Sequence, residues 1–437
     1  MVANLEQGRL LGPDLFFSCP PSVENLFLSI RMSRLAGQEE HSHDATMELS
    51  NIFNILATNN PDNIVSDSET DAAEGTGNNS SNGKVAGLPC RQEPLKKLTE
   101  LSLWNMVNGV VLKDILEYTP NLEKLSLPPI YTAIDTTILA DHIASRCHKI
   151  HTINYDTLGG MPSTDLALKI LERLPQQQVK SFHCSYFDCV IDDLMARNVF
   201  QRHSATLRHL QLHGGIAVSS MAIQVILTEC PALEKLETLL IDRTSSIMLG
   251  HAVEKPWVCT KLKTLELSVG MTKLSLEGGV RPYYDRDHPV VLFPQEKEQF
   301  DALEKFYRQV AALVDLENLK LRLQPFNAHQ PTSDGSDYME YTFPAMLSVG
   351  DDVKGYPGYL DLFAGLTKLK RLQGSTYANT EETFETMGWS EARWFTTHLP
   401  ALGTVEFFQQ GQKTRAPFKW LERQQRGARR PLVLYLQ

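Results

Sequence analysis

The sequence contains none of the common motifs of enzyme active sites. It has no G-x-S-x-G elbow, no phosphate-binding loop that ends in Gly-Lys-Ser/Thr, no dinucleotide fingerprint and no H-E-x-x-H pair. Two pairs of adjacent carboxylates, at 192–193 and 351–352, have no acid, base or metal ligand set beside them. We therefore expect no enzymatic activity and no cofactor.

Cysteine is scarce and has no disulfide or metal pattern. The seven cysteines among 437 residues are odd in number, and four of them precede a copy of the repeated phrase described below: Cys19, Cys147, Cys230 and Cys259. This placement predicts one repeated buried turn position rather than disulfide halves, and hence a reducing compartment, the cytoplasm or the nucleus.

Two groups of histidine and cysteine were considered as metal sites. The first is His142, Cys147, His148 and His151, and the second is His183 with Cys184 and Cys189. Neither group has the paired spacing that places four ligands around zinc, so we expect no metal site.

Long apolar runs and excess positive charge are also missing. The N-terminus lacks the basic start and apolar run of a signal peptide, and no stretch approaches the roughly 18 apolar residues that span a membrane. A net charge of -10 and a pI near 5.7 disfavour non-specific attraction to nucleic acid or anionic lipid. We expect neither nucleic acid nor a membrane as a partner. A basic protein surface is a more suitable partner for a chain of this charge.

One phrase, L-x-x-L-x-L, recurs along the chain, most plainly in 259–268 (CTKLKTLELS) and 119–127 (TPNLEKLSL). Apolar side chains spaced by three and then by two suit a short strand entered from a turn. From Leu98 to Leu262 successive copies start 24, 28, 29, 28, 26 and 29 residues apart, which is the period of a leucine-rich repeat. The copies begin at Val23, Leu98, Leu122, Ile150, Val179, Leu207, Leu233, Leu262, Leu316, Leu369 and Leu402.

Amphipathic segments with N-cap signals separate the phrases, at 110–119, 136–147, 164–174, 191–203 and 219–230. One strand and one helix per repeat predict an α/β leucine-rich-repeat solenoid, a horseshoe with a concave parallel sheet and convex helices. We expect a monomer.

The composition divides the chain into four regions. Residues 1–58 hold the first repeat, with a helix predicted over 47–56, and residues 59–94 are an acidic and polar insertion that buries too little apolar surface to fold. Residues 95–412 form the solenoid, with loop excursions at 271–299 and 324–358 and a helix over 300–313 between them. Residues 413–437 form a basic tail and C-terminal cap. The basic run is either a solvated face or a binding site for an acidic partner or RNA.

The repeat also predicts a binding surface. Positions 4 and 6 of the phrase point into the core, so positions 3, 5 and 7 face the concave side. Two of these positions hold aromatic residues, Phe27 and Trp104, which would serve as interface anchors unless loops or caps cover them. Three histidines, His183, His209 and His213, lie on neighbouring strands and form either a pH-sensitive contact or an ordinary exposed cluster. The candidate partner-binding residues are Phe27, Trp104, Asn154, Asp156, His183, His209, Gln211, His213, Glu266, Lys320 and Arg322.

Three segments carry a family resemblance: CPALEKL at 230–236, WVCTKLKTLEL at 257–267 and LFAGLTKLKRL at 362–372. They resemble the fungal F-box and leucine-rich-repeat proteins of the ribonuclease-inhibitor-like class. The resemblance implies that the repeats hold the substrate of an SCF-type ubiquitin ligase, while an F-box docks on Skp1 and, through it, on a cullin. The first phrase begins near Cys19 and leaves no room for an F-box within this sequence, so Skp1 binding is expected only if an F-box is supplied upstream.

We therefore expect a non-enzymatic recognition scaffold that resembles the substrate-binding repeats of an F-box subunit. The alternative is a free-standing repeat protein that regulates or inhibits an enzyme or a GTPase.

Deletion of residues 60–94 should leave the melting transition nearly unchanged, because this composition cannot support a core. Calorimetry of the deletion variant against the full chain tests this expectation. Loss of cooperative unfolding in the variant would show instead that the segment caps the solenoid.

Overall fold

The computed structural model describes residues 2–3, 19, 21–29, 93–104, 107–127, 130–131, 135–156, 165–185, 190–213, 217–238, 245–272, 294–326, 349–350, 353, 358–375, 389–407, 416–427 and 433–434. The helix predicted over 47–56 and the insertion predicted over 59–94 lie outside these residues, except for Glu93 and Pro94.

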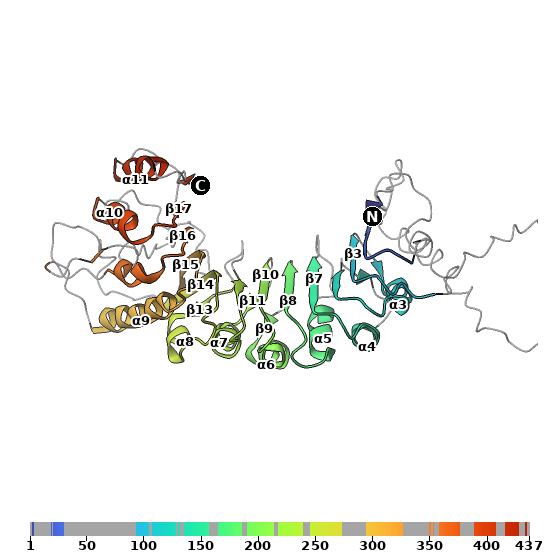
Figure 1. The fold of residues 1–437 in the computed structure, drawn as a ribbon. Coiled ribbons are helices and arrows are strands. Elements are labelled where there is room, and N and C mark those ends of the chain that lie inside the picture. Colours follow the sequence, from blue (N-terminus) through green and yellow to red (C-terminus); the bar gives the residue numbers. More distant parts are fainter. Residues whose placement is uncertain are drawn as a thin grey trace, which may run out of the picture.

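A single 14-stranded sheet runs through the described chain, and all its strand pairs are parallel (Figure 1). All eleven phrases form strands, and each strand begins two residues after the start of its phrase, because the first leucine lies in the preceding turn. These strands are β2 (Asn25–Ser29), β3 (Glu100–Trp104), β5 (Lys124–Leu127), β7 (Thr152–Asp156), β8 (Ser181–Ser185), β10 (His209–His213), β12 (Lys235–Glu237), β14 (Thr264–Thr272), β15 (Asn318–Phe326), β16 (Arg371–Ser375) and β17 (Thr404–Phe407). The predicted fold class is confirmed as a leucine-rich-repeat solenoid.

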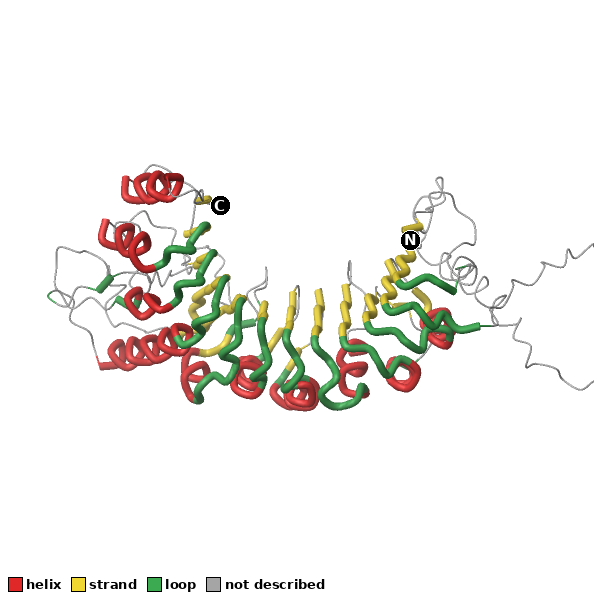
Figure 2. The backbone as a smooth tube through the Cα atoms, in the orientation of Figure 1, coloured by secondary structure: helices red, strands yellow, loops and turns green. Residues whose placement is uncertain are grey.

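Helices follow the strands and lie on the outside of the arc, while the strands line its inside (Figure 2). The five amphipathic segments predicted between phrases are confirmed as the helices α3 to α7. The helices are α3 (Gly109–Glu117), α4 (Thr136–Arg146), α5 (Asp165–Arg173), α6 (Asp193–Val199) with the 3-10 turn η1 (Gln201–His203), α7 (Ser220–Glu229), α8 (Leu249–Glu254), α9 (Pro294–Ala311), the 3-10 helix η3 (Leu360–Gly365), α10 (Trp389–His398) and α11 (Ala416–Gly427).

The N-cap signals act as expected. The side chains of Asp135, Asp192 and Ser219 each accept a hydrogen bond from a backbone N–H in the first turn of the following helix, at 2.7, 2.8 and 3.1 Å. These bonds satisfy donors that a helix cannot pair internally.

Short strands extend the repeat beyond the predicted set. At the two ends of the sheet, β1 (Val2–Ala3) pairs with β2 and β18 (Val433–Leu434) pairs with β17. The segment predicted as a basic tail and C-terminal cap thus contains helix α11 and strand β18. Two-residue strands also pair elsewhere: β4 (Val107–Asn108) with β6 (Ile130–Tyr131), β9 (Val190–Ile191) with β11 (Ala217–Val218), and β13 (Ile247–Met248) with the end of β14.

The core lies between the sheet and the helices and is built from the same positions in each repeat. In the phrase at Leu262, the leucines at positions 1, 4 and 6 are all fully buried: Leu262, Leu265 and Leu267. The buried turn position predicted for cysteine is confirmed for Cys147, Cys230 and Cys259, whereas Cys19 is only half-buried. The carbonyls of Cys147, Cys230 and Cys259 accept the N–H of the first phrase residue at 3.0, 3.3 and 3.2 Å, and all three side chains are fully buried.

Burial has a chemical consequence for these thiols. It raises the pKa of Cys147 to about 11 and those of Cys230 and Cys259 to about 12. The thiols therefore stay protonated near neutral pH and act as small apolar groups rather than nucleophiles.

A backbone ladder joins each repeat to the next. The carbonyl at position 2 of one phrase accepts the N–H groups of positions 2 and 3 of the following phrase, as Lys263 does from Glu317 and Asn318 at 2.8 and 2.9 Å. Ten carbonyls make this pair of bonds: those of Glu24, Thr99, Glu123, His151, Lys180, Arg208, Glu234, Lys263, Glu317 and Lys370.

Three boundaries predicted around the excursions are wrong. Strands β14 and β15 run to Thr272 and Phe326 in continuous register, so they extend past the predicted loop starts at 271 and 324. Helix α9 begins at Pro294 rather than at residue 300, because proline is well tolerated in the first turn of a helix. The rest of both excursions lies largely outside the described residues.

Aromatic side chains pack around helix α9, where the regular repeat period is interrupted. Tyr307 of α9 stacks on Tyr359 with ring centroids 5.4 Å apart and meets Phe363 edge-on at 5.5 Å. The Tyr359 hydroxyl donates to the Phe300 carbonyl at 2.9 Å, and Trp257 contacts Phe306 at 5.7 Å. These contacts tie α9 to the repeats on either side.

Replacing Leu265 with alanine should lower the free energy of unfolding by about 2 to 5 kcal/mol, because it removes fully packed side-chain volume. Since repeats couple mainly to their neighbours, hydrogen-exchange protection should fall mostly between about residues 207 and 323. Ser181→Ala, at a half-exposed position of β8, is the control and should change stability by less than about 1 kcal/mol. A cost near zero for Leu265→Ala would contradict its place in the core.

Candidate recognition surface on the concave face

The strand register aligns equivalent side chains into rows across the sheet. Asn154, His183, Gln211, Glu237, Glu266 and Lys320 are consecutive Cα partners and form the position-5 row. Thr152, Ser181, His209, Lys235, Thr264 and Asn318 form the position-3 row in the same way. Between these two rows the side chains at position 4 are buried, so the alternation predicted from the phrase is present.

A polar network is centred on the position-5 row and includes one residue each from positions 3 and 7; its members are His183, Gln211, His213, Lys235 and Glu237. His183 Nδ1 lies 3.0 Å from Gln211 Oε1, and Gln211 Nε2 donates a hydrogen bond to Glu237 Oε2. Lys235 Nζ lies 2.9 Å from Glu237 Oε1, and His213 Nε2 lies 3.4 Å from Glu237 Oε2. We call this set the Glu237 network. It joins three neighbouring strands, β8, β10 and β12.

Glu237 is the most buried member of the network, with 9% of its surface exposed. Burial alone would raise the pKa of its carboxyl, but hydrogen bonds from His213, Gln211 and Lys235, together with the charge of Lys235, lower that pKa to about 2. The carboxylate therefore stays ionised near neutral pH and accepts hydrogen bonds without donating any.

The three candidate histidines are only partly clustered. The rings of His183 and His213 lie 5.6 Å apart, centroid to centroid, whereas His209 lies in the position-3 row between Ser181 and Lys235. Burial is the main cause that lowers the pKa of His209, which favours its neutral form.

The other candidates lie along the same face. Phe27 is half-buried, and Val2 of β1 is its Cα partner at this end of the sheet. Asn154 Nδ2 donates to Ser126 Oγ at 3.0 Å. Lys320 Nζ lies 3.5 Å from Glu266 Oε2.

Only the backbone is described for the remaining candidates, Trp104, Asp156 and Arg322. Trp104 is the Cα partner of Ser29, and Asp156 is the Cα partner of Ser185. Arg322 pairs with Ser268 on one side and Ser375 on the other.

The prediction that position 7 faces the concave solvent side fails for two serines. Ser185 and Ser268 occupy this position, and they are only 8% and 1% exposed. A short side chain between longer neighbours is readily covered, whereas His213 at the same position is half-exposed. Position 7 therefore contributes to the surface only where its side chain is long.

Sequence reasoning missed Lys235 and Glu237 as site residues. The phrase that starts at Leu233 was recognised, and its spacing places these two residues at positions 3 and 5, but they were not among the candidates. That spacing was the signal that could have found them. Their importance comes from contacts with β10, and a repeat pattern does not show such contacts.

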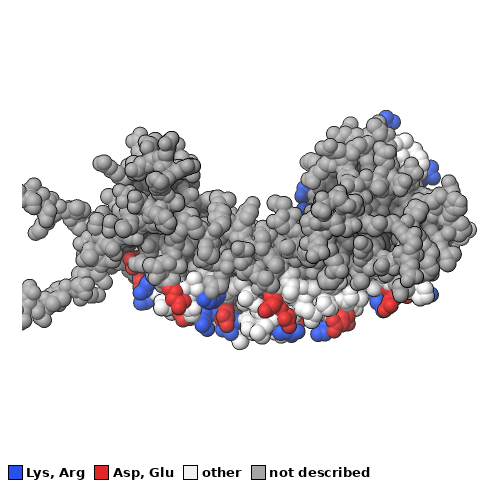
Figure 3. Space-filling view, turned by 180° about the vertical axis from the view of Figure 1, so that it is seen from behind, with Lys and Arg blue, Asp and Glu red and all other residues white. Residues whose placement is uncertain are grey.

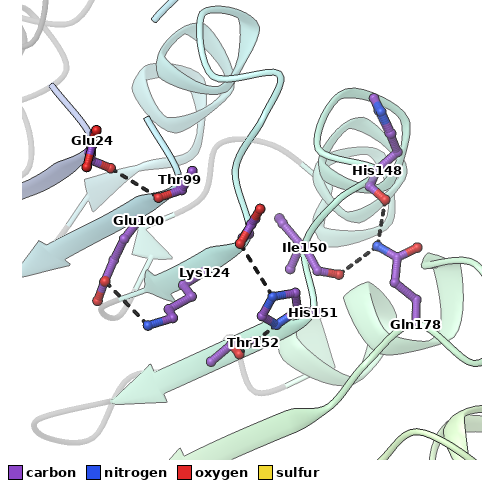
Figure 4. Close-up of polar contacts among 10 residues, drawn as sticks. Glu24, Thr99, Glu100, Lys124, His148, Ile150, His151, Thr152 and Gln178 are labelled. Atoms are coloured by element: carbon purple, nitrogen blue, oxygen red, sulfur yellow. Dashed lines mark hydrogen bonds and ion pairs between the residues drawn. The ribbon is translucent and has the colours of Figure 1, made fainter. Parts of the chain in front are cut away.

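A second set of polar contacts joins the repeats near the start of the strands (Figure 4). Thr99 Oγ1 donates to the Glu24 carbonyl, Lys124 pairs with Glu100 at 3.6 Å, and the Gln178 side chain donates to two carbonyls of the preceding repeat at 2.7 and 2.6 Å. Further along this edge Lys263 pairs with Glu234 at 2.7 Å, and Lys370 pairs with Glu317 at 2.6 Å. These groups are occupied in holding neighbouring repeats together.

The described surface seen from behind mixes charges of both signs (Figure 3). Ion pairs also link neighbouring helices, as between Arg146 and Glu117 at 3.1 Å and between Arg173 and Asp141 at 2.9 Å. Exposed pairs of this kind contribute little to stability.

Members of the first histidine and cysteine group considered as a metal site have different surroundings, and Cys189 of the second group lies outside the described residues. His142 Nε2 lies 3.5 Å from Glu117, His151 Nε2 lies 3.6 Å from Glu123, and Cys147 is buried in its turn. Within the described ranges no group of three His, Cys, Asp or Glu side chains is arranged to hold a metal ion. Of the helices the structure describes, none has the length and apolar character needed to cross a bilayer.

Glu237 should make the fold sensitive to acid. The pKa of its carboxyl in the folded protein, about 2, lies below the ordinary value of 4.5, so the ionised group stabilises the fold above pH 4.5. This contribution, on the order of 3 kcal/mol, is lost as the pH falls from 4.5 towards 2. In urea denaturation the stability difference between the wild type and Glu237→Gln should therefore shrink over this range.

The control for this experiment is Glu172→Gln, on the exposed side of α5, because surface substitutions change stability by less than about 0.5 kcal/mol. A wild-type advantage over Glu237→Gln that stays constant from pH 7 to pH 3 would show that the network does not hold Glu237 ionised.

Comparisons with known proteins show a distant likeness in fold. No family model matches the sequence, and no curated protein matches it significantly. A chain from the crystal structure of the yeast Rad7 and Elc1 complex is 14% identical, with a TM-score of 0.32, over 78% of this chain and 80% of its own. The leucine-rich repeat-containing protein LegL7 from Legionella pneumophila is 11% identical, with a TM-score of 0.26, over 72% of this chain and 94% of its own. Neither likeness assigns a function.

Proposed function

We propose that the protein is a non-enzymatic recognition scaffold that binds a protein partner on its concave face, as the substrate-binding repeats of an F-box ubiquitin-ligase subunit do. The observation that carries the proposal is the pair of concave rows. Their side chains are half-exposed at most positions and differ from strand to strand, while the side chains at position 4 beneath them are buried and apolar on every strand.

This arrangement suits recognition because the side chains at the exposed positions 3 and 5 can vary independently of those at the buried positions. Parallel strands about 4.8 Å apart present a continuous row, so a partner that follows the row meets a new side chain on each strand. Chemical identity at positions 3 and 5 can change without disturbing the buried positions, since the repeats stack through their cores.

The concave face is also long enough for a specific complex. A stable interface buries roughly 800 Å² on each partner, contributed by about 20 to 30 residues. The two rows run through eleven consecutive strands, from β2 to β17, so they offer positions for an interface of this size. A protein surface or an extended segment would fill this face better than a small ligand.

Affinity purification from the native cell, followed by mass spectrometry, would identify the partner. Recovery of a Skp1-type adaptor and a cullin together with a substrate supports a ubiquitin-ligase role. Recovery of a single enzyme or GTPase without an adaptor supports the alternative role of a free-standing regulator. A catalytic activity intrinsic to the purified chain would contradict both proposals.

Alanine at four concave positions, His183, His209, Gln211 and Glu266, should weaken binding of the identified partner strongly, because each anchor in such an interface contributes about 1 to 4 kcal/mol. The matched control carries four alanines on the convex helices, at Ile138, Arg146, Arg173 and Leu194, and should bind like the wild type. Calorimetry with the purified partner measures both variants.

The opposite pattern would overturn the site assignment. If the concave variant binds normally and deletion of 273–293 or 327–348 abolishes binding, the excursions form the site and the horseshoe only supports them.

A further inference from the structure

A row of charged residues runs along the edge of the sheet where the strands begin. It consists of the residues at position 2 of each phrase, and the backbone ladder makes consecutive members direct neighbours. The N–H of Arg208 donates to the Lys180 carbonyl at 2.8 Å, and Glu234 and Lys263 continue the row through two further bonds of the same length. Four consecutive repeats therefore carry three cations and one carboxylate in line.

The carboxylate in this row is already paired. Glu234 accepts a hydrogen bond from Lys263 Nζ at 2.7 Å, whereas Arg208 lies farther from it, at 3.6 Å. The bond from Lys263 is the main cause that lowers the pKa of the Glu234 carboxyl. Glu234 is therefore ionised near neutral pH, and its charge is matched by that of Lys263.

Three cations of the same edge are left without a matching carboxylate. Lys180 and Lys261 are exposed, and neither has an ion pair within the described part of the chain. Arg208 is exposed and shares Glu234 with the closer Lys263. With four cations and one carboxylate, three positive charges stay uncompensated. We call Lys180, Arg208 and Lys261 the basic edge.

The charges on both sides of the basic edge are balanced. Beyond Lys263, Asp315 and Glu317 each pair with a lysine of the next repeat, at 2.5 and 2.6 Å. On the other side, Glu123 lies 3.6 Å from His151, while Lys149 donates to a neutral amide oxygen at 2.8 Å, so this flank adds one carboxylate and one cation. The basic edge is thus a local excess of positive charge in a chain whose net charge is -10.

Two neighbouring imidazoles experience this charge. Burial is the main cause that lowers the pKa of His151, which precedes Lys180 in the row (Figure 4), and the charge of Lys180 lowers it further. Burial also lowers the pKa of His209, and the charges of Arg208 and two lysines add to this effect against the single opposing charge of Glu234. Positive charge therefore outweighs negative charge around both rings.

We propose that the basic edge binds an acidic protein segment, an extended run of Asp or Glu side chains. From β8 to β14 the edge covers three steps of about 4.8 Å, or about 14 Å, and six extended residues at about 3.3 Å each span this length. The Arg208 guanidinium presents a fork of donors that matches a carboxylate, and Lys180 and Lys261 add point charges on either side. This surface borders the concave rows but is separate from them, because position 2 precedes position 3 on each strand.

The surroundings favour carboxylates over a nucleic acid. Single-stranded nucleic acid binds where aromatic side chains accompany the cations and stack on the bases. The turn segments 177–181, 205–209, 231–235 and 260–264 contain no Phe, Tyr or Trp. The net charge of -10 also repels a long polyanion, whereas a short acidic segment responds mainly to charges within a Debye length, about 8 Å at physiological ionic strength.

The first test compares three fluorescein-labelled probes by fluorescence anisotropy with the full chain: hexaglutamate, its neutral isostere hexaglutamine, and hexauridylate. Hexaglutamate should bind at least about tenfold more tightly than either of the others. Its affinity should fall when the salt concentration rises from about 0.01 to about 0.15 M, because the Debye length shrinks from about 30 to about 8 Å. Equal binding of hexaglutamine would overturn the inference. Equal or tighter binding of hexauridylate would do so as well, since it would indicate a phosphate site.

A triple variant tests the assigned residues. Lys180→Gln, Arg208→Gln and Lys261→Gln together remove the three uncompensated charges, so the affinity for hexaglutamate should fall about tenfold, a loss of about 1.4 kcal/mol. All three positions are exposed, so the substitutions leave the core intact. Wild-type affinity in the triple variant would overturn the inference.

The matched control changes the same number of charges on the outer helices. Lys113→Gln on α3, with Lys297→Gln and Lys305→Gln on α9, gives the same net charge at exposed positions away from the edge. This control should bind hexaglutamate like the wild type. An equal loss of affinity in both triple variants would show that only the total charge matters, and would overturn the assignment to the basic edge.

Crosslinking of the unmodified protein locates the probe without any variant. A carbodiimide joins carboxylates to lysine amines, so mass spectrometry should find hexaglutamate attached mainly to Lys180, Lys261 and Lys263. Attachment mainly to Lys413 and Lys419, in the predicted basic tail, or to lysines of the outer helices, would place the acidic segment elsewhere and overturn the inference.

Discussion

The structure depends on a backbone bond that recurs at each step of the solenoid. A single carbonyl at position 2 accepts two N–H groups of the next repeat, as Lys180 does from Arg208 and His209 at 2.8 and 3.0 Å. This pair of bonds sets the register before the strand begins. A slip of one residue would turn every leucine of a strand outward, so register, core and concave rows are established together.

The chemistry of the concave face follows from that register. Gln211 lies between His183 and Glu237 because β8, β10 and β12 pair in line. A largely buried carboxylate must be matched by donors, and Gln211 and Lys235 fill that role within the sheet. The carboxylate of Glu237 is thereby paired within the sheet rather than left exposed on the concave face. The ion pairs at the strand starts link adjacent repeats, as the helix-to-helix pairs do, and both kinds are partly exposed.

The sequence predicted the repeated elements well because their signals are local. All eleven strand starts, the five helices α3 to α7 and the buried cysteine turns follow from spacing within one repeat. It predicted the surface less well. The spacing places Glu237 on the concave side as surely as Glu266, but only its contacts with Gln211 and His213 make it the centre of a network.

What the sequence by itself determined is therefore the solenoid and the two concave rows, because apolar periodicity decides which side chains are buried. The tertiary structure alone decided the orientation of Gln211, the cover over Ser185 and Ser268, and the pairing of β1 and β18 at the ends of the sheet. The physical reason is distance along the chain. Gln211 meets His183 from 28 residues away and Glu237 from 26, and no pattern within one repeat records which side chains of neighbouring repeats will meet.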